Sequence, residues 1–145
     1  AHAVKQVERK LDAGRLRMRI VPGFFNETLT ARLAHDAHPA WYVDLNADLF
    51  VSTRQALAWL FGNNLARPGT LLMYDDWFNT PFLEGESRAH VETARDFGAT
   101  FRLLYRCHGR SRSGNLVLFR VEAVSASSAG SDGVVDALKH FRVWR

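Results

Sequence analysis

The sequence has little of several residue types and patterns that define common protein classes. Cys107 is the only cysteine in 145 residues, so no disulfide can form within the chain, and we expect a reducing, cytoplasmic location. The sequence shows neither a signal peptide nor a run of about 18 apolar residues, so we expect no secretion and no membrane partner. It also contains no Walker loop and no GxGxxG, GxSxG or HExxH motif. The common motifs for nucleotide binding and hydrolysis therefore do not indicate a function for this sequence.

Charge of one sign is not concentrated in any segment. The formal net charge is +4, and the arginines are spread along the chain except in GRSRSG (109–114), which we expect to be a solvated hairpin loop. We therefore expect no nucleic-acid partner. With 47% hydrophobic and 23% charged residues, the composition is typical of a globular domain. We predict an α/β domain over residues 1–124, a small-residue linker over 125–133 and a separate tail segment over 134–145.

Hydrophobic periodicity predicts helices alternating with strands. Such alternation is typical of a mostly parallel sheet with helices on its faces, and the short connection between the last two strands predicts an antiparallel pair. The pair Ser52 and Gln55 fits a capping box that would start one helix. We expect Cys107 to pack inside a strand. The predicted helices are 3–14, 29–33, 52–62 and 85–98, with Ala56, Leu57, Leu60 and Phe61 facing the core, and the predicted strands are 15–21, 40–50, 70–74, 101–107 and 116–121.

Two adjacent aspartates follow an apolar strand in the segment LLMYDDWFN (71–79). Asp75 and Asp76 repel each other, and partial burial would increase that repulsion. Asn46 and Asp48 follow the preceding strand, and in a parallel sheet the carboxyl ends of neighbouring strands meet at one edge. Oxygen ligands at such an edge suit Mg²⁺. The alternative is a turn, in which Asp76 caps the next segment and Asp75 accepts hydrogen bonds from loop amides.

Other polar and aromatic residues give weaker signals. The six histidines show no metal-ligand spacing, and the sequence leaves open whether His90 belongs to a site or to the surface. Trp77 and Phe78 directly follow the aspartate pair. They could flank a ligand, although a role for Trp77 in the core is the simpler interpretation.

Four segments occur in an order that resembles a known family. They are GFFNETL (23–29), NADLFVST (46–53), RPGTLLMYDDWFN (67–79) and GESRA (85–89). This set resembles class I S-adenosylmethionine-dependent methyltransferases, and within them the macrocin O-methyltransferase-like group, which methylates hydroxyls on sugars of natural products. The resemblance covers roughly residues 15–122. It implies a Rossmann-like sheet, S-adenosylmethionine as cofactor and a small-molecule hydroxyl as methyl acceptor.

The resemblance also implies a site. In that family, acidic residues after the fourth and fifth strands hold a divalent cation, usually Mg²⁺, which orients the acceptor hydroxyl and lowers its pKa. By position, Asp75 and Asp76 match the fifth-strand pair and would be the catalytic residues and metal ligands, with Asp48 and Asn46 completing the metal site. Asn46 stands where the family has an aspartate, so it would bring an oxygen but no charge. The substrate-binding residues would be Trp77 and Phe78.

One part of the family pattern is missing from this sequence. The glycine-rich loop after the first strand and the acidic residue after the second, which hold the cofactor, are not found, so the resemblance implies a sheet without its first two strands and leaves the cofactor-binding residues unidentified. The family's strand order is 3-2-1-4-5-7-6, and the gap would leave an open edge. Three hypotheses follow: a metal-assisted O-methyltransferase, a non-catalytic methyltransferase-like domain that binds a partner chain or forms an oligomer, and an unrelated α/β enzyme using the aspartates as acid and base.

Overall fold

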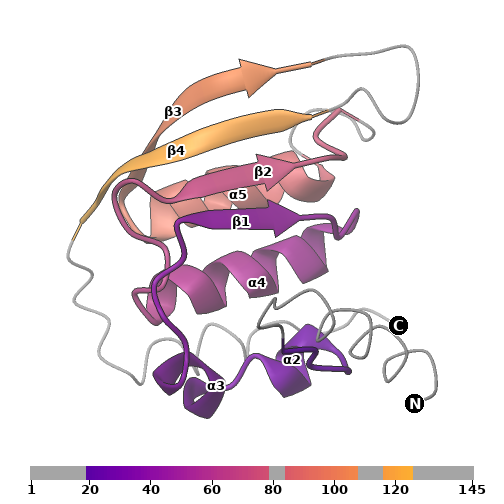
Figure 1. The fold of residues 1–145 in the computed structure, drawn as a ribbon. Helices are drawn as coiled ribbons and strands as arrows, with labels where there is room; N and C mark the ends of the chain where they lie inside the picture. The colour runs from indigo at the N-terminus through magenta and orange to yellow at the C-terminus, as the bar shows by residue number, and fades with distance from the viewer. Residues whose placement is uncertain (1–18, 79–83, 108–115, 126–145) are drawn as a thin grey trace, which may run out of the picture.

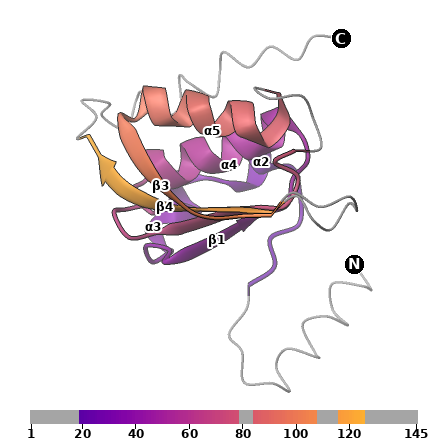
Figure 2. The ribbon, with the colours of Figure 1, turned by 90° about the horizontal axis from the view of Figure 1, so that it is seen from above.

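The chain folds around a four-stranded mixed sheet that is covered on one face by two helices (Figures 1 and 2). The computed structural model describes residues 19–78, 84–107 and 116–125. Within these ranges the elements are α2 (Phe25–Thr28), α3 (Ala31–His35), β1 (Tyr42–Leu45), α4 (Phe50–Gly62), β2 (Leu71–Tyr74), α5 (Gly85–Asp96), β3 (Ala99–Arg106) and β4 (Val117–Val124). Their alternation confirms an α/β fold.

The order of strands across the sheet is β1-β2-β4-β3. β1 and β2 are parallel, and Tyr42 pairs with Leu71 while Leu45 pairs with Tyr74. Both strands therefore end at the same edge, as the sequence predicted. β4 lies antiparallel to β2 and to β3, which confirms the predicted antiparallel pairing of the last two strands. Figure 1 shows β1 and β2 as neighbouring arrows that point the same way.

The core lies between the sheet and helices α4 and α5. Leu72 and Tyr74 alternate along β2 and are fully buried, because successive side chains of a strand point to opposite faces. The core residues predicted on α4 are confirmed as buried. They are Ala56, Leu57, Leu60 and Phe61, and they pack with residues of the strands that include Leu45, Leu72, Val117 and Val121.

The described sheet is mixed, and β4 is the strand that runs opposite to the others. One pair is parallel and two are antiparallel, because β4 returns beside β2 and places β3 at the outer edge. Residues 19–21, expected to end a strand, belong to no helix or strand. The expected helix 3–14, most of the strand 15–21, the loop 109–114, the tail 134–145 and all of the linker 125–133 except Ser125 lie outside the described residues.

The boundaries of two other elements differ from the prediction. β1 ends at Leu45, and α4 begins at Phe50 with Leu49 as its N-cap, so the proposed cap Ser52 lies inside the first turn. The chain turns between them at Asp48, whose φ of 53° is in the left-handed region that Asp tolerates better than most residues. Cys107 is partly buried and follows the end of β3, where its N–H donates to the carbonyl of Leu116 across the hairpin (2.8 Å). It is therefore not a residue inside the strand.

Among the described residues, no helix combines the length and the apolar character that a bilayer span requires.

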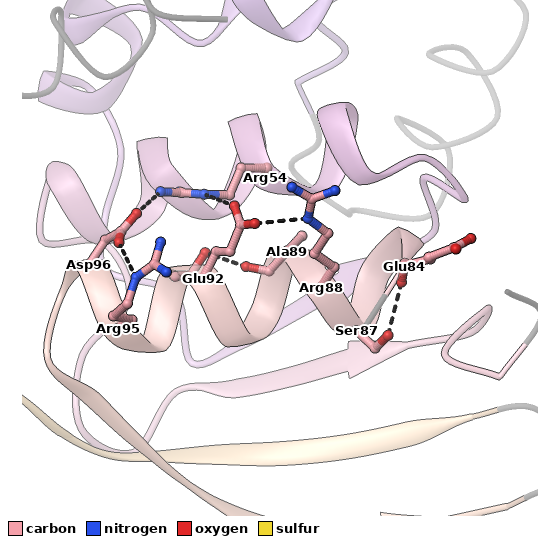
Figure 3. A network of polar contacts seen from close by, with 9 residues as sticks. Arg54, Glu84, Ser87, Arg88, Ala89, Glu92, Arg95 and Asp96 are labelled. Atoms are coloured by element: carbon pink, nitrogen blue, oxygen red, sulfur yellow. Dashed lines mark hydrogen bonds and ion pairs between the residues drawn. The ribbon is translucent and has the colours of Figure 1, made fainter. Parts of the chain in front are cut away.

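A network of ion pairs joins α4 to α5 (Figure 3). Arg54 of α4 is only 5% exposed, and its guanidinium contacts Asp96 at 2.5 Å and Glu92 at 3.9 Å, both on α5. Arg95 also contacts Asp96 (3.1 Å), but its side chain is 74% exposed. A charged side chain buried as deeply as Arg54 needs its partners, because a buried charge without them is costly. Arg54 thus fixes the position of α5 against α4.

We predict that Arg54→Ala lowers the free energy of unfolding by about 2 kcal/mol, because it removes a buried cation and leaves two carboxylates without it. The matched control is Arg95→Ala, which removes an exposed partner of the same Asp96 and should cost less than about 0.5 kcal/mol. Urea unfolding of both variants measures the difference. If both variants lost the same free energy of unfolding, the burial of Arg54 would not explain its contribution to stability.

Candidate functional site: an acidic edge of the sheet

Five carboxylates gather where β1 and β2 end. The parallel pairing brings the turn after β1 beside the residues that follow β2, and the first turn of α5 packs behind them. Asp44 and Asp48 raise the pKa of Asp75, and Asp75 and Asp76 raise the pKa of Glu86, because nearby carboxylates disfavour one another's ionised forms. We call this group the acidic edge; its members are Asp44, Asp48, Asp75, Asp76 and Glu86.

Asp75 occupies the centre of the acidic edge. Its side chain is partly buried, and among the residues that the structure describes no donor reaches its Oδ1 atom. Burial raises the pKa of Asp75, the neighbouring carboxylates of Asp44 and Asp48 add to that rise, and its own backbone amide opposes it. The Oδ1 atom of Asp75 therefore has no loop hydrogen bond among the described residues, while its own backbone amide acts on the carboxylate.

Glu86 is the acidic residue that the sequence analysis missed. It lies in the first turn of α5 and is 1% exposed. Its Oε2 atom accepts a hydrogen bond from the backbone N–H of Asp76 (3.1 Å), while its Oε1 atom is buried without a partner in the described part of the chain. Burial raises the pKa of Glu86 to about 7; the carboxylates of Asp75 and Asp76 contribute to the rise, and the amides of Asp76 and Ala47 oppose it.

The residues predicted to hold a metal are brought to one region but not into one ligand set. Asn46 and Asp48 are exposed, and Asp48 is near enough to Asp75 to affect its pKa. Asp76 is partly buried and is tied to Glu86 through its backbone. Across residues 19–78, 84–107 and 116–125, no three His, Cys, Asp or Glu side chains are placed to hold a metal ion together. The predicted set of Asn46, Asp48, Asp75 and Asp76 stays a prediction.

The aromatic residues after the aspartate pair pack inward. Trp77 is 8% exposed, and its ring lies 5.0 Å from that of Tyr74 and 5.1 Å from that of Phe119. This placement agrees with the interpretation of Trp77 as a core residue. Phe78 is partly buried and packs against the core, and the rest of the predicted substrate loop, 79–83, is outside the described residues. A role in substrate binding stays a prediction for both.

His90 forms a buried polar contact behind the acidic edge. Its Nδ1 atom lies 2.9 Å from the hydroxyl oxygen of Tyr74, and its ring lies 4.2 Å from Phe101 and 4.4 Å from Phe119. Burial lowers the pKa of His90 to about 4, so the imidazole is neutral near pH 7. Burial and the Glu86 carboxylate raise the pKa of Tyr74 well above its ordinary value. His90 is therefore an interior residue and not a surface residue.

Neither any protein-family model nor any curated protein or solved structure matches the chain.

The buried His90 predicts a loss of stability in mild acid. Its pKa is about 4 in the folded state and near 6.5 when unfolded, so the unfolded chain takes up the proton first as the pH falls. The contribution of neutral His90 to the free energy of unfolding is complete above pH 6.5. That contribution should shrink by about 2 kcal/mol by pH 5. His90→Gln keeps a polar group beside Tyr74 and cannot titrate in this range. Urea unfolding from pH 7 to 5 should show a smaller loss in His90→Gln than in the original chain; identical slopes would contradict a depressed pKa of His90.

Proposed function

We propose that this chain belongs to a divalent-metal-assisted, S-adenosylmethionine-dependent O-methyltransferase that acts on a hydroxyl of a small molecule. The observation that carries the proposal is the Asp75 carboxylate, whose buried Oδ1 atom lacks a partner among the described residues while Asp44 and Asp48 lie near it. A cation at this edge would give that oxygen a partner and neutralise the repulsion between the carboxylates. The oxygens available fit Mg²⁺, which commonly takes one or two carboxylates and fills its other positions with water and substrate.

The arrangement of strands supports the same proposal. The family that the motifs resemble has the strand order 3-2-1-4-5-7-6, and its last four strands in that order would correspond to the observed order β1-β2-β4-β3. On this correspondence Asp75 and Asp76 follow the fifth strand and Asp48 follows the fourth. The acidic edge then stands where the family places its cation.

The proposed chemistry assigns separate tasks to the cation and to the chain. A bound cation would lower the pKa of the acceptor hydroxyl and hold its oxygen in place. The Asp75 carboxylate would hold the cation, and the parallel pair of β1 and β2 would keep the acidic residues in register. The methyl group would come from S-adenosylmethionine, and transfer would depend mainly on the orientation of the two reactants.

We predict that Asp75→Asn weakens Mg²⁺ binding at least roughly tenfold, because the amide keeps the shape of the side chain and loses the charge that ligates the ion. Asp44→Asn is the matched control: it removes one nearby charge from an exposed position in β1 and should change affinity only about twofold through screened electrostatics. Calorimetric titration of the 145-residue chain measures both affinities.

The same titration tests the cofactor when S-adenosylmethionine is added with and without Mg²⁺. Cofactor binding that strengthens with Mg²⁺, and that Asp76→Ala loses while its unfolding curve is unchanged, would support the methyltransferase. Equal effects of Asp75→Asn and Asp44→Asn, or no binding of either ligand by the original chain, would contradict it.

A second candidate function is that of a non-catalytic domain that binds another chain or a second copy through β1. The observation that favours it is the open edge of the described sheet: β1 pairs on one side only, and beside it Trp41 is 78% and Tyr42 is 40% exposed. An unpaired strand edge with exposed aromatic residues is suited to adding a strand from a partner.

If β1 pairs two copies, sedimentation of the chain should show a dimer that Trp41→Lys weakens several-fold, because a charge would be buried at the interface. Phe24→Lys is the matched control, since Phe24 is 75% exposed and lies outside the sheet. A monomer at all concentrations, or an equal effect of both substitutions, would count against self-association through this edge.

A further inference from the structure

We propose that Glu86 is a direct ligand of the divalent cation and shares it with Asp75. The inference deepens the proposed function and rests on it, because it names a residue that neither the motifs nor their spacing assigned to the metal site.

The position of Glu86 is fixed from two sides. Its backbone belongs to the first turn of α5, and its Oε2 atom is held by the N–H of Asp76 at 3.1 Å. Because this hydrogen bond holds Oε2, the protein and not solvent sets the direction in which the second carboxylate oxygen points. That other oxygen, Oε1, is buried and finds no donor in the described part of the chain. Glu86 therefore presents one oxygen that is oriented and available for a ligand.

Two side chains of the acidic edge each have a buried carboxylate oxygen without a hydrogen-bond partner in the described residues. These oxygens are Oδ1 of Asp75 and Oε1 of Glu86. The two carboxylates also interact, since Asp75 raises the cost of ionising Glu86. Leaving a buried acceptor unsatisfied is costly, and more so for a charged group. A single cation between the two oxygens would satisfy both and would turn their mutual repulsion into attraction to a common ion.

Glu86 also restores the charge that Asn46 lacks. The resemblance places a further carboxylate at position 46, and an amide there leaves the ion with less negative charge around it. With Asp75 and Glu86 the site has two carboxylates, which is a usual number for Mg²⁺, and water and the acceptor oxygen would complete the octahedron.

The test uses Mn²⁺ as a spectroscopic substitute for Mg²⁺ and measures free Mn²⁺ by electron paramagnetic resonance during titration of the full chain. Glu86→Gln keeps the size of the side chain and an oxygen that can accept from Asp76, but it removes the charge. We expect this variant to bind Mn²⁺ roughly 10- to 100-fold more weakly. The matched control is Glu84→Gln: Glu84 is the exposed N-cap residue of the same helix, so the same charge is removed at the same helix end. It should change affinity less than about twofold.

The outcomes separate this inference from the proposed function. If the original chain binds Mn²⁺, and Asp75→Asn loses binding while Glu86→Gln retains it, the role of Glu86 is wrong and the metal site at Asp75 stands. If the original chain binds no Mn²⁺, both are overturned. Should Glu86→Gln fail to fold, Glu86→Asp keeps the charge but withdraws the oxygen by one methylene, and undiminished Mn²⁺ binding by Glu86→Asp would overturn the inference.

Discussion

The parallel pairing of β1 with β2 is the constraint on which the site depends. It carries the turn containing Asp48 and the pair Asp75 and Asp76 to one edge of the sheet. The resulting repulsion is not relieved by hydrogen bonds to Oδ1 of Asp75 or Oε1 of Glu86 within the described residues. A fold that holds carboxylates in this way has stability to gain from a cation, and that gain is the physical basis of the functional proposal.

The packing behind the sheet determines where Glu86 lies. Arg54 joins α4 to α5 through Asp96 and Glu92, so the position of α5 is fixed near its carboxyl end. Nearer its start, His90 is enclosed by aromatic rings and contacts Tyr74 of β2. With both parts of the helix held, its first turn has little freedom to move Glu86 away from Asp76. Structural residues far from the edge thus set the geometry of the candidate ligand.

Local patterns in the sequence predicted much of this fold, and tertiary relations explain what they missed. The spacing of Leu57, Leu60 and Phe61 marked the buried face of α4, and the order of apolar runs predicted that β1 and β2 are neighbours. The strand β4 lies beside β2 and antiparallel to it. This position depends on the path of the hairpin, which no local pattern encodes. Glu86 was missed because an acidic residue in the first turn of a helix is ordinarily explained by the helix dipole. Only the packing of α5 against the strands shows that Glu86 is buried.

The most direct test of a cation at the acidic edge is crystallography with Mn²⁺, using the anomalous scattering of the metal to locate it. We expect a Mn²⁺ peak in contact with Oδ1 of Asp75 and Oε1 of Glu86, with water filling the remaining positions. A crystal soaked at saturating Mn²⁺ that shows no anomalous peak at this edge, and ordered water bonded to both oxygens instead, would contradict this expectation.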